Sequence, residues 1–356
     1  MKNTLTVICF NLAINSSMGM EEDQGFILDK NIIHNTLQDD PILANLGNYS
    51  LEIIVGGLGG ARLYRLQTEE KNLVVRIQNN GIFSTENLYE DAKIASESRY
   101  GPYLHLSNSE KGLMIMDEIP NDCSLSRTGN KFYKKLTNAI RTMHQGPLFS
   151  KKKNFLEWIR DAEEKLQNKA IHYPIMNDTD KTLYKQTIEE ISSLMPLFED
   201  DIKPCHHDLH PGNILHDDNQ LVLIDFESAS NDVFFFDLGI TTYYHTYEDA
   251  DISNFLRSYF EGDPSPEHNA KFICLRPLAG LFHAFWWADI AGLSTLSKHQ
   301  EIPLYKKIQP LIRQGTMDLT SKYVQQSVAI SICNEAIRLL KEDKFRQSID
   351  FLRKKI

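Results

Sequence analysis

The sequence lacks the features of several common protein classes. Beyond its first twenty residues no hydrophobic run is long enough to cross a bilayer, so we expect no stable membrane insertion. It contains neither internal repeats nor low-complexity tracts. Its five cysteines are scattered, odd in number and without the spacing of metal ligands. Cysteines used in this way indicate buried thiols in a reducing compartment, so we expect a cytoplasmic protein.

Excess positive charge is missing as well. The 48 acidic residues outnumber the 38 lysines and arginines, and the formal net charge of -10 argues against a general nucleic-acid binder. Such a charge would suit a cationic substrate, although a solvated acidic surface is the simpler explanation. With 356 residues, 42% hydrophobic and 24% charged, the chain has the composition of a folded protein with two lobes or one large domain.

The first twenty residues differ from the rest of the chain. Residues 4–14 are mildly apolar and follow Lys2, a pattern that is loosely typical of a signal peptide. Asn11 interrupts the run, and no small-x-small cleavage site follows it. We therefore expect a disordered or misassigned leader, with Met18 and Met20 as alternative starts.

The most informative segment spans residues 206–227. Asp208 is followed five residues later by Asn213, and Asp225 comes directly after a short apolar run. A phosphoryl-transfer site needs this arrangement, because one aspartate accepts the proton of an attacking hydroxyl while the other two residues hold magnesium on the nucleotide phosphates. Two short strands joined by a tight acidic turn would present all three residues on one side. The alternative is a loop rich in histidine and aspartate that only separates two strands.

The same motifs resemble those of a known family. His207, Asp208 and Asn213, followed by isoleucine-aspartate-phenylalanine-glutamate at 224–227, are similar to the motifs of aminoglycoside kinases, choline and ethanolamine kinases and related small-molecule kinases. Residues 228–239 are most similar to the choline/ethanolamine branch, in which a polar turn also precedes phenylalanine-aspartate. The resemblance covers about residues 50 to 295 and implies ATP and Mg2+ as cofactors.

The fold implied by this resemblance is α+β and bilobal, as in protein kinases. It has a small antiparallel β-sheet in the N-lobe and a mostly helical C-lobe. We expect a leader and a first helix in residues 1–40 and the nucleotide-binding N-lobe in 41–118. The C-lobe, with the catalytic loop and the substrate pocket, would take 119–325, followed by a C-terminal helical extension in 326–356.

The N-lobe contains three predicted strands, at residues 51–55, 61–66 and 73–77. A glycine-rich turn connects the first two and consists of Gly56, Gly57, Leu58, Gly59 and Gly60. Glycines let backbone amides approach phosphates closely, which favours a nucleotide-phosphate loop at this place in the chain. The alternative is an ordinary hairpin, since any hairpin can use glycines.

Arg76 occupies the position at which kinases carry the lysine that contacts the nucleotide phosphates. Choline kinases also have arginine here, and its planar fork suits phosphate. A predicted helix at 85–98 would supply a glutamate to orient this arginine. Glu86 and Glu90 are one turn apart, and we favour Glu90; otherwise both are surface charges. After a strand at 113–116, backbone groups from Met116 to Ile119 should meet the adenine at the hinge between the lobes.

Supporting residues surround the catalytic motif. The resemblance implies that Asp237 braces the catalytic loop through hydrogen bonds, and we expect His207 to do so through a backbone carbonyl. Glu227 lies two residues beyond Asp225 and would assist either magnesium or the substrate. His144 ends a helix predicted from residue 136 and is expected in core packing.

Recognition of a quaternary ammonium group needs aromatic faces and carboxylates. Trp286, on an apolar helix predicted at 277–293, matches one tryptophan of the choline-kinase pocket. The second family tryptophan falls on His283, and an expected glutamate falls near Tyr244, so choline itself is in doubt. The alternative for Trp286 is core packing.

We therefore expect an ATP- and Mg2+-dependent phosphotransferase that acts on the hydroxyl of a small acceptor. A cationic amino alcohol, as in choline and ethanolamine kinases, is the favoured acceptor class, with aminoglycoside or thiamine kinase activity as alternatives. A protein kinase is a different alternative, although the alanine-proline-glutamate motif that closes an activation segment is missing. A third alternative is a nucleotide-binding scaffold, against which Asp208, Asn213 and Asp225 argue.

Overall fold

The computed structural model describes most of the chain from residue 24 onward. The described ranges are residues 24–41, 43–45, 47–54, 61–78, 86–120, 127–168, 175–216, 220–246, 248–292, 305–313, 319 and 321–356. The expected leader, the glycine-rich turn with Gly56, Gly57, Gly59 and Gly60, and the acidic turn at 217–219 lie outside these ranges.

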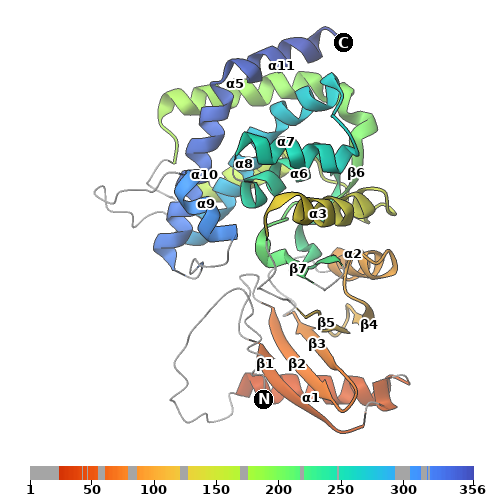
Figure 1. Cartoon of the computed structure of the whole chain (residues 1–356). Helices are drawn as coiled ribbons and strands as arrows, with labels where there is room; N and C mark the ends of the chain where they lie inside the picture. The colour runs from red at the N-terminus through yellow and green to blue at the C-terminus, as the bar shows by residue number, and fades with distance from the viewer. Residues whose placement is uncertain are drawn as a thin grey trace.

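A five-stranded antiparallel sheet forms the N-lobe, at one end of the molecule in Figure 1, with strand order β1-β2-β3-β5-β4. Its strands are β1 (Tyr49–Ile54), β2 (Arg62–Thr68), β3 (Asn72–Ile77), β4 (Leu104–Asn108) and β5 (Leu113–Asp117). The strands predicted in this lobe are therefore confirmed. The edge strand β4 was not predicted, because it is short, half polar and irregular in register between Leu104 and Leu106.

Helix α1 (Gln24–Asp39), followed by the 3-10 helix η1 (Leu43–Asn45), covers one face of this sheet. Ile33 and Leu37 lie one turn apart on the buried side of α1 and pack in one cluster with strand residues such as Leu66 and Val75. Asp29 is also buried, where it accepts hydrogen bonds from Arg62 and Tyr64 of β2. These contacts attach α1 to the sheet.

The C-lobe is mostly helical, as expected. Its helices are α3 (Gly129–His144), α4 (Phe155–Asn168), α5 (Asp178–Leu194), α6 (Phe234–His245), α7 (Asp249–Phe260), α8 (Pro266–Ala291), α9 (Tyr305–Arg313), α10 (Lys322–Leu340) and α11 (Asp343–Arg353). Helix α2 (Glu86–Glu97) lies between β3 and β4 in sequence, within the N-lobe, and packs against β4. Among the described residues, no helix is both long and apolar enough to cross a membrane.

Short strands and turns carry the loops that face the N-lobe. β6 (Ile202–Cys205) pairs with β9 (Ser230–Val233), and β7 (Ile214–His216) pairs with β8 (Leu221–Leu223), both antiparallel. The 3-10 helices are η2 (Met195–Asp201), η3 (Pro211–Asn213) and η4 (Phe226–Ser228). The two strands predicted on either side of the acidic turn are therefore confirmed as β7 and β8.

Helix α8 is the centre of the C-lobe and is apolar on nearly every side, as expected of a helix surrounded by protein. Its start at Pro266 corrects the prediction of a helix beginning at residue 277, because Pro277 lies inside the helix. The Ser265 side chain caps the true start by accepting a hydrogen bond from the His268 amide, 3.1 Å away. Gly280 permits close packing, since a Cβ there would lie 2.3 Å from the Tyr243 ring.

Helix α10 packs along α8 and completes the core of the C-lobe. Its buried side chains include Val328, Ile332, Cys333 and Ala336. Helix α11 then packs against α5 and α8, with Ile349 and Leu352 fully covered. The predicted helical extension is thus confirmed as helical, and its apolar faces belong to the same hydrophobic core as the catalytic segment.

Candidate active site

The loop between β6 and β7 contains Asp208. Asp237, at the start of α6, holds this loop through hydrogen bonds to its backbone. One carboxylate oxygen of Asp237 accepts the His206 amide at 2.7 Å, and the other accepts the His207 amide at 2.7 Å. His144 from α3 lies 3.2 Å from the same carboxylate. Burial opposes the charge, but these hydrogen bonds outweigh it and lower the pKa of Asp237 to about 2. The bracing role expected of Asp237 is therefore confirmed.

The two histidines of the loop have different partners. The His207 ring lies 2.9 Å from the buried carboxylate of Asp232, which corrects the expectation that it bonds a backbone carbonyl. His206 makes that kind of bond, through Nε2 to the Ile224 carbonyl at 2.9 Å. His207 has a φ of 63°, in the left-handed region that non-glycine residues seldom adopt. The chain therefore turns sharply just before Asp208, and its bonds to Asp232 and Asp237 fix that turn.

Asp208 and Asn213 meet across the loop. The Asn213 amide nitrogen donates to the Asp208 carboxylate at 2.8 Å and to the Asp208 backbone carbonyl at 2.9 Å. With the nitrogen used in this way, the amide oxygen of Asn213 is left to act as a ligand. Burial raises the pKa of Asp208 well above its usual range, and the nearby negative charge of Asp225 raises it further. Asp208 is thus poised to take up a proton.

His210 was not singled out from the sequence, yet its ring lies beside Asp208. Its Nδ1 accepts the Gly212 amide at 3.0 Å, and its Nε2 is 3.6 Å from a carboxylate oxygen of Asp208. Burial, together with the charge of His206, lowers the pKa of His210 to about 3. The ring is therefore neutral, with its proton on the nitrogen that faces Asp208. Only the pattern His-Asp-x-His could have indicated it.

Asp225 follows β8 and has a left-handed backbone, with φ of 67° and ψ of 70°. The preceding amide, of Ile224, donates to the Asn213 carbonyl at 3.0 Å, so the segments that contain Asn213 and Asp225 are tied together. The Asp225 side chain is 37% exposed and that of Glu227 is 23% exposed. An amide oxygen and two carboxylates are hard donors of the kind that suits Mg2+.

Arg76 reaches from the N-lobe into this acidic group. One amino group of its guanidinium is 3.2 Å from the Asp225 carboxylate, and the other contacts Glu227 and is 2.9 Å from the side-chain oxygen of Gln78. Burial and the charge of Asp225 raise the pKa of Glu227, while Arg76 opposes that rise. Glu90 is exposed on α2 instead of facing Arg76. The expected pairing with Glu90 is therefore replaced by pairing with carboxylates of the C-lobe.

The expected adenine contacts lie where β5 ends. Met116 is half-buried and in register with Val74 of β3, and Ile119 is half-buried just beyond the strand. Glu118, between them, accepts a hydrogen bond from Arg65 at 2.8 Å. In sequence, this segment lies between the N-lobe sheet and the C-lobe helices.

A chain of hydrogen bonds joins α6 and α8 to the catalytic loop. Trp287 donates to the Tyr244 hydroxyl at 3.0 Å, which lies 2.8 Å from His283 Nδ1. His283 Nε2 then donates to the His207 carbonyl at 3.1 Å, and burial lowers the pKa of His283 to about 3, so the ring is neutral. Tyr244 and His283 are buried and hold the loop, whereas Trp286 is half-buried.

Comparison with known proteins identifies the family to which this chain belongs. Residues 54–268 match the model of the phosphotransferase enzyme family, which is more than half of the chain and spans Arg76, the catalytic loop and Asp225. The chain belongs to this family. The protein is therefore a phosphotransferase. No protein of curated function matches it in sequence.

Solved structures show the same fold as this phosphotransferase at low sequence identity. A choline/ethanolamine kinase family protein from Mesorhizobium loti has a TM-score of 0.65 at 17% identity, over 92% of this chain and 99% of that one. The choline kinase LicA from Streptococcus pneumoniae has a TM-score of 0.55 at 18% identity, over 82% and 99%. A spectinomycin phosphotransferase has a TM-score of 0.51 at 15% identity, over 80% and 93%. These likenesses confirm the bilobal kinase-like fold.

Proposed function

We propose that this phosphotransferase transfers the γ-phosphoryl group of ATP, with Mg2+, to the hydroxyl of a small amine-bearing acceptor. The observation that carries the proposal is the meeting of Arg76 with Asp225 and Glu227, next to the hydrogen-bonded pair of Asp208 and Asn213. This region therefore combines three groups. They are the guanidinium of Arg76, the oxygen donors of Asn213 and Asp225 for a metal, and the Asp208 carboxyl with its raised pKa. Positioning and charge neutralisation are what phosphoryl transfer needs most.

The nucleotide would lie between the lobes. The backbone from Met116 to Ile119 would meet the adenine, and Arg76 together with the glycine-rich turn, Gly56 to Gly60, would hold the phosphates. Two related solved proteins support nucleotide binding, since LicA was solved with AMP and the spectinomycin phosphotransferase with ADP. Cytoplasmic ATP would supply the phosphoryl group.

Asp208 would act as the base. Its carboxylate accepts a hydrogen bond from Asn213, which fixes its orientation, and burial raises its pKa well above the usual range, which favours uptake of the proton of a substrate hydroxyl. Mg2+ would be held by the amide oxygen of Asn213 and the carboxylate of Asp225, with Glu227 beside them. The metal would neutralise the charge of the phosphates.

The acceptor is proposed as a cationic amino alcohol. Trp286 is half-buried, and cation–π attraction to its ring would hold an ammonium group. Asp289 follows three residues later on α8, so its carboxylate lies on the same helix face as Trp286. Tyr244 and His283 would contribute indirectly, because they are bonded to each other and to the loop. The choline and ethanolamine kinases among the related structures support this acceptor class.

The test is Mg2+-dependent ADP release across choline, ethanolamine, thiamine, an aminoglycoside and no acceptor. We expect one amino alcohol to stimulate release at least tenfold, and Asp208→Asn to abolish the stimulation while ATP still binds. Asp200→Asn is the matched control, since Asp200 is an exposed aspartate outside the site. Unchanged ADP release in Asp208→Asn would refute the mechanism, and stimulation by thiamine or an aminoglycoside alone would refute the acceptor class.

A further inference from the structure

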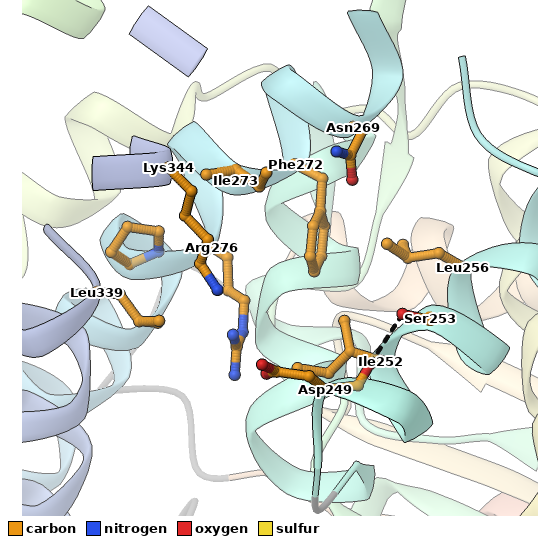
Figure 2. Close-up of a pocket in the computed structure, with 11 residues that line it drawn as sticks. Asp249, Ile252, Ser253, Leu256, Asn269, Phe272, Ile273, Arg276, Leu339 and Lys344 are labelled. Carbon is orange, nitrogen blue, oxygen red and sulfur yellow. Dashed lines mark hydrogen bonds between the residues drawn. The ribbon is translucent and has the colours of Figure 1, made fainter. Parts of the chain in front are cut away.

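A cavity on the C-lobe lies among α7, α8, α10 and α11 (Figure 2). Its volume is about 180 Å³, and its lining includes Asp249, Ser253, Phe272, Arg276, Leu339 and Lys344. None of these residues belongs to the catalytic site described above. A cavity of roughly 150 Å³ is enough to hold benzene, so this one has room for a ring-sized molecule.

Arg276 is the unusual group in this cavity. Its side chain extends from α8 into the space between α7 and α11, as Figure 2 shows. It is only 8% exposed, its Nε donates to the Thr242 hydroxyl at 3.2 Å, and its guanidinium lies 5.3 Å from the centre of the Tyr243 ring. In the described part of the chain no carboxylate lies within 4.0 Å of it.

The other buried cations of the described chain are neutralised. Arg76, also 8% exposed, contacts the carboxylates of Asp225 and Glu227. Lys271, five residues before Arg276 on the same helix and 5% exposed, lies 2.6 Å from Asp201 and 3.0 Å from Glu267. A buried charge that no carboxylate contacts is costly, so Arg276 differs from both, and an anion bound in the cavity would stabilise it.

The remaining walls limit the kind of anion. Phe272, Ile273, Leu339 and other apolar side chains form most of the lining. Lys344, at the edge, is already paired with Glu342 at 2.9 Å, and the exposed Asp249 contributes one negative charge near the opening. A large or highly charged anion would be repelled by Asp249 and would lose its hydration against the apolar walls. A single carboxylate on a small apolar body fits both the guanidinium and the lining.

We propose that this cavity is a binding site for a small organic carboxylate, whose charged group pairs with Arg276 and whose apolar part contacts Phe272 and Leu339. The guanidinium presents parallel donors to a carboxylate and is held in place by Thr242 and the Tyr243 ring, so little ordering is needed on binding.

Benzoate is the probe, measured by saturation-transfer NMR and calorimetry on the full chain. We expect saturable binding to the wild type, at least tenfold weaker binding to Arg276→Gln, and unchanged binding to Arg257→Gln, an exposed arginine on α7. Benzamide has the same shape without the charge and should bind at least tenfold more weakly than benzoate. Circular dichroism and ATP binding establish that each variant is folded.

A second variant keeps the test decisive if Arg276→Gln does not fold. Ser253 is exposed at the edge of the cavity, so Ser253→Trp should obstruct the opening and weaken benzoate binding at least tenfold with Arg276 in place. The proposal is overturned by absence of saturable benzoate binding to the wild type, by equal affinity for benzamide, or by full affinity in either cavity variant.

Discussion

Asp237→Asn changes one atom of the side chain that holds the catalytic loop, and the cost follows from its contacts. In the native protein the two carboxylate oxygens accept the amides of His206 and His207, both at 2.7 Å. Asparagine has one acceptor oxygen and one amino group. In either orientation, one of the two backbone N–H groups must face another donor.

The magnitude has two parts. A buried donor left without an acceptor costs roughly 1–3 kcal/mol. The remaining bond loses its charge assistance, which is worth about 1 kcal/mol. We therefore expect Asp237→Asn to lower the free energy of unfolding by roughly 2–4 kcal/mol. Because the displaced loop carries Asp208, kcat should fall as well.

Urea unfolding of the two proteins measures the difference, with Asp200→Asn as the control for an aspartate-to-asparagine change at an exposed position. The control should unfold like the wild type. A loss of less than about 1 kcal/mol in Asp237→Asn would contradict the role assigned to the carboxylate.

The same group sets a pH dependence. Despite its burial, hydrogen bonds from His144 and the loop amides lower the pKa of Asp237 to about 2, from an ordinary value of 3.8. This difference corresponds to about 2 kcal/mol of stability, which is complete above about pH 4 and is lost as the pH falls toward about 2. The difference in free energy of unfolding between the wild type and Asp237→Asn should become smaller as the pH falls over that interval. A difference that stays constant with pH would contradict the lowered pKa of Asp237.

Two further substitutions and one deletion test other parts of the structure. Arg76→Lys keeps the charge but loses the planar fork, so the KM for ATP should rise about tenfold in steady-state assays while the melting temperature changes little; an unchanged KM would contradict the phosphate role. His283→Phe leaves the His207 carbonyl without its donor, and kcat should fall about tenfold with KM for ATP retained. Deleting residues 341–356 removes α11 and uncovers part of α5 and α8, which should increase binding of a hydrophobic dye; native-like dye binding would refute the packing role.

The strands and turns that bring Asp208, Asn213 and Asp225 together could be predicted from the sequence because their spacing is local. Asp208 and Asn213 are five residues apart in one loop, and Asp225 follows a strand that pairs with its neighbour. The N-lobe strands were predictable from short apolar runs bounded by turn residues. Pro277 shows how such a signal can mislead, because proline often begins a helix but here lies within one that other helices surround.

Long-range partners were not predictable in the same way. Nothing near Arg76 in sequence indicates that its carboxylates are Asp225 and Glu227, which are 149 and 151 residues away. The family pattern also placed Tyr244 and His283 at the substrate. Their burial and mutual hydrogen bond depend on the packing of α6 against α8, which no single segment encodes.

The place of α10 in the core has a consequence for biosynthesis. Helix α8 is apolar on nearly all sides, and one of those sides is covered by α10, which begins thirty-one residues after α8 ends (291 to 322). Since a ribosome adds about 5–20 residues per second, α8 is synthesised seconds before α10, the helix that packs against it. The nascent chain therefore passes through an interval with a hydrophobic helix unprotected, during which a chaperone that binds apolar segments would compete with self-association.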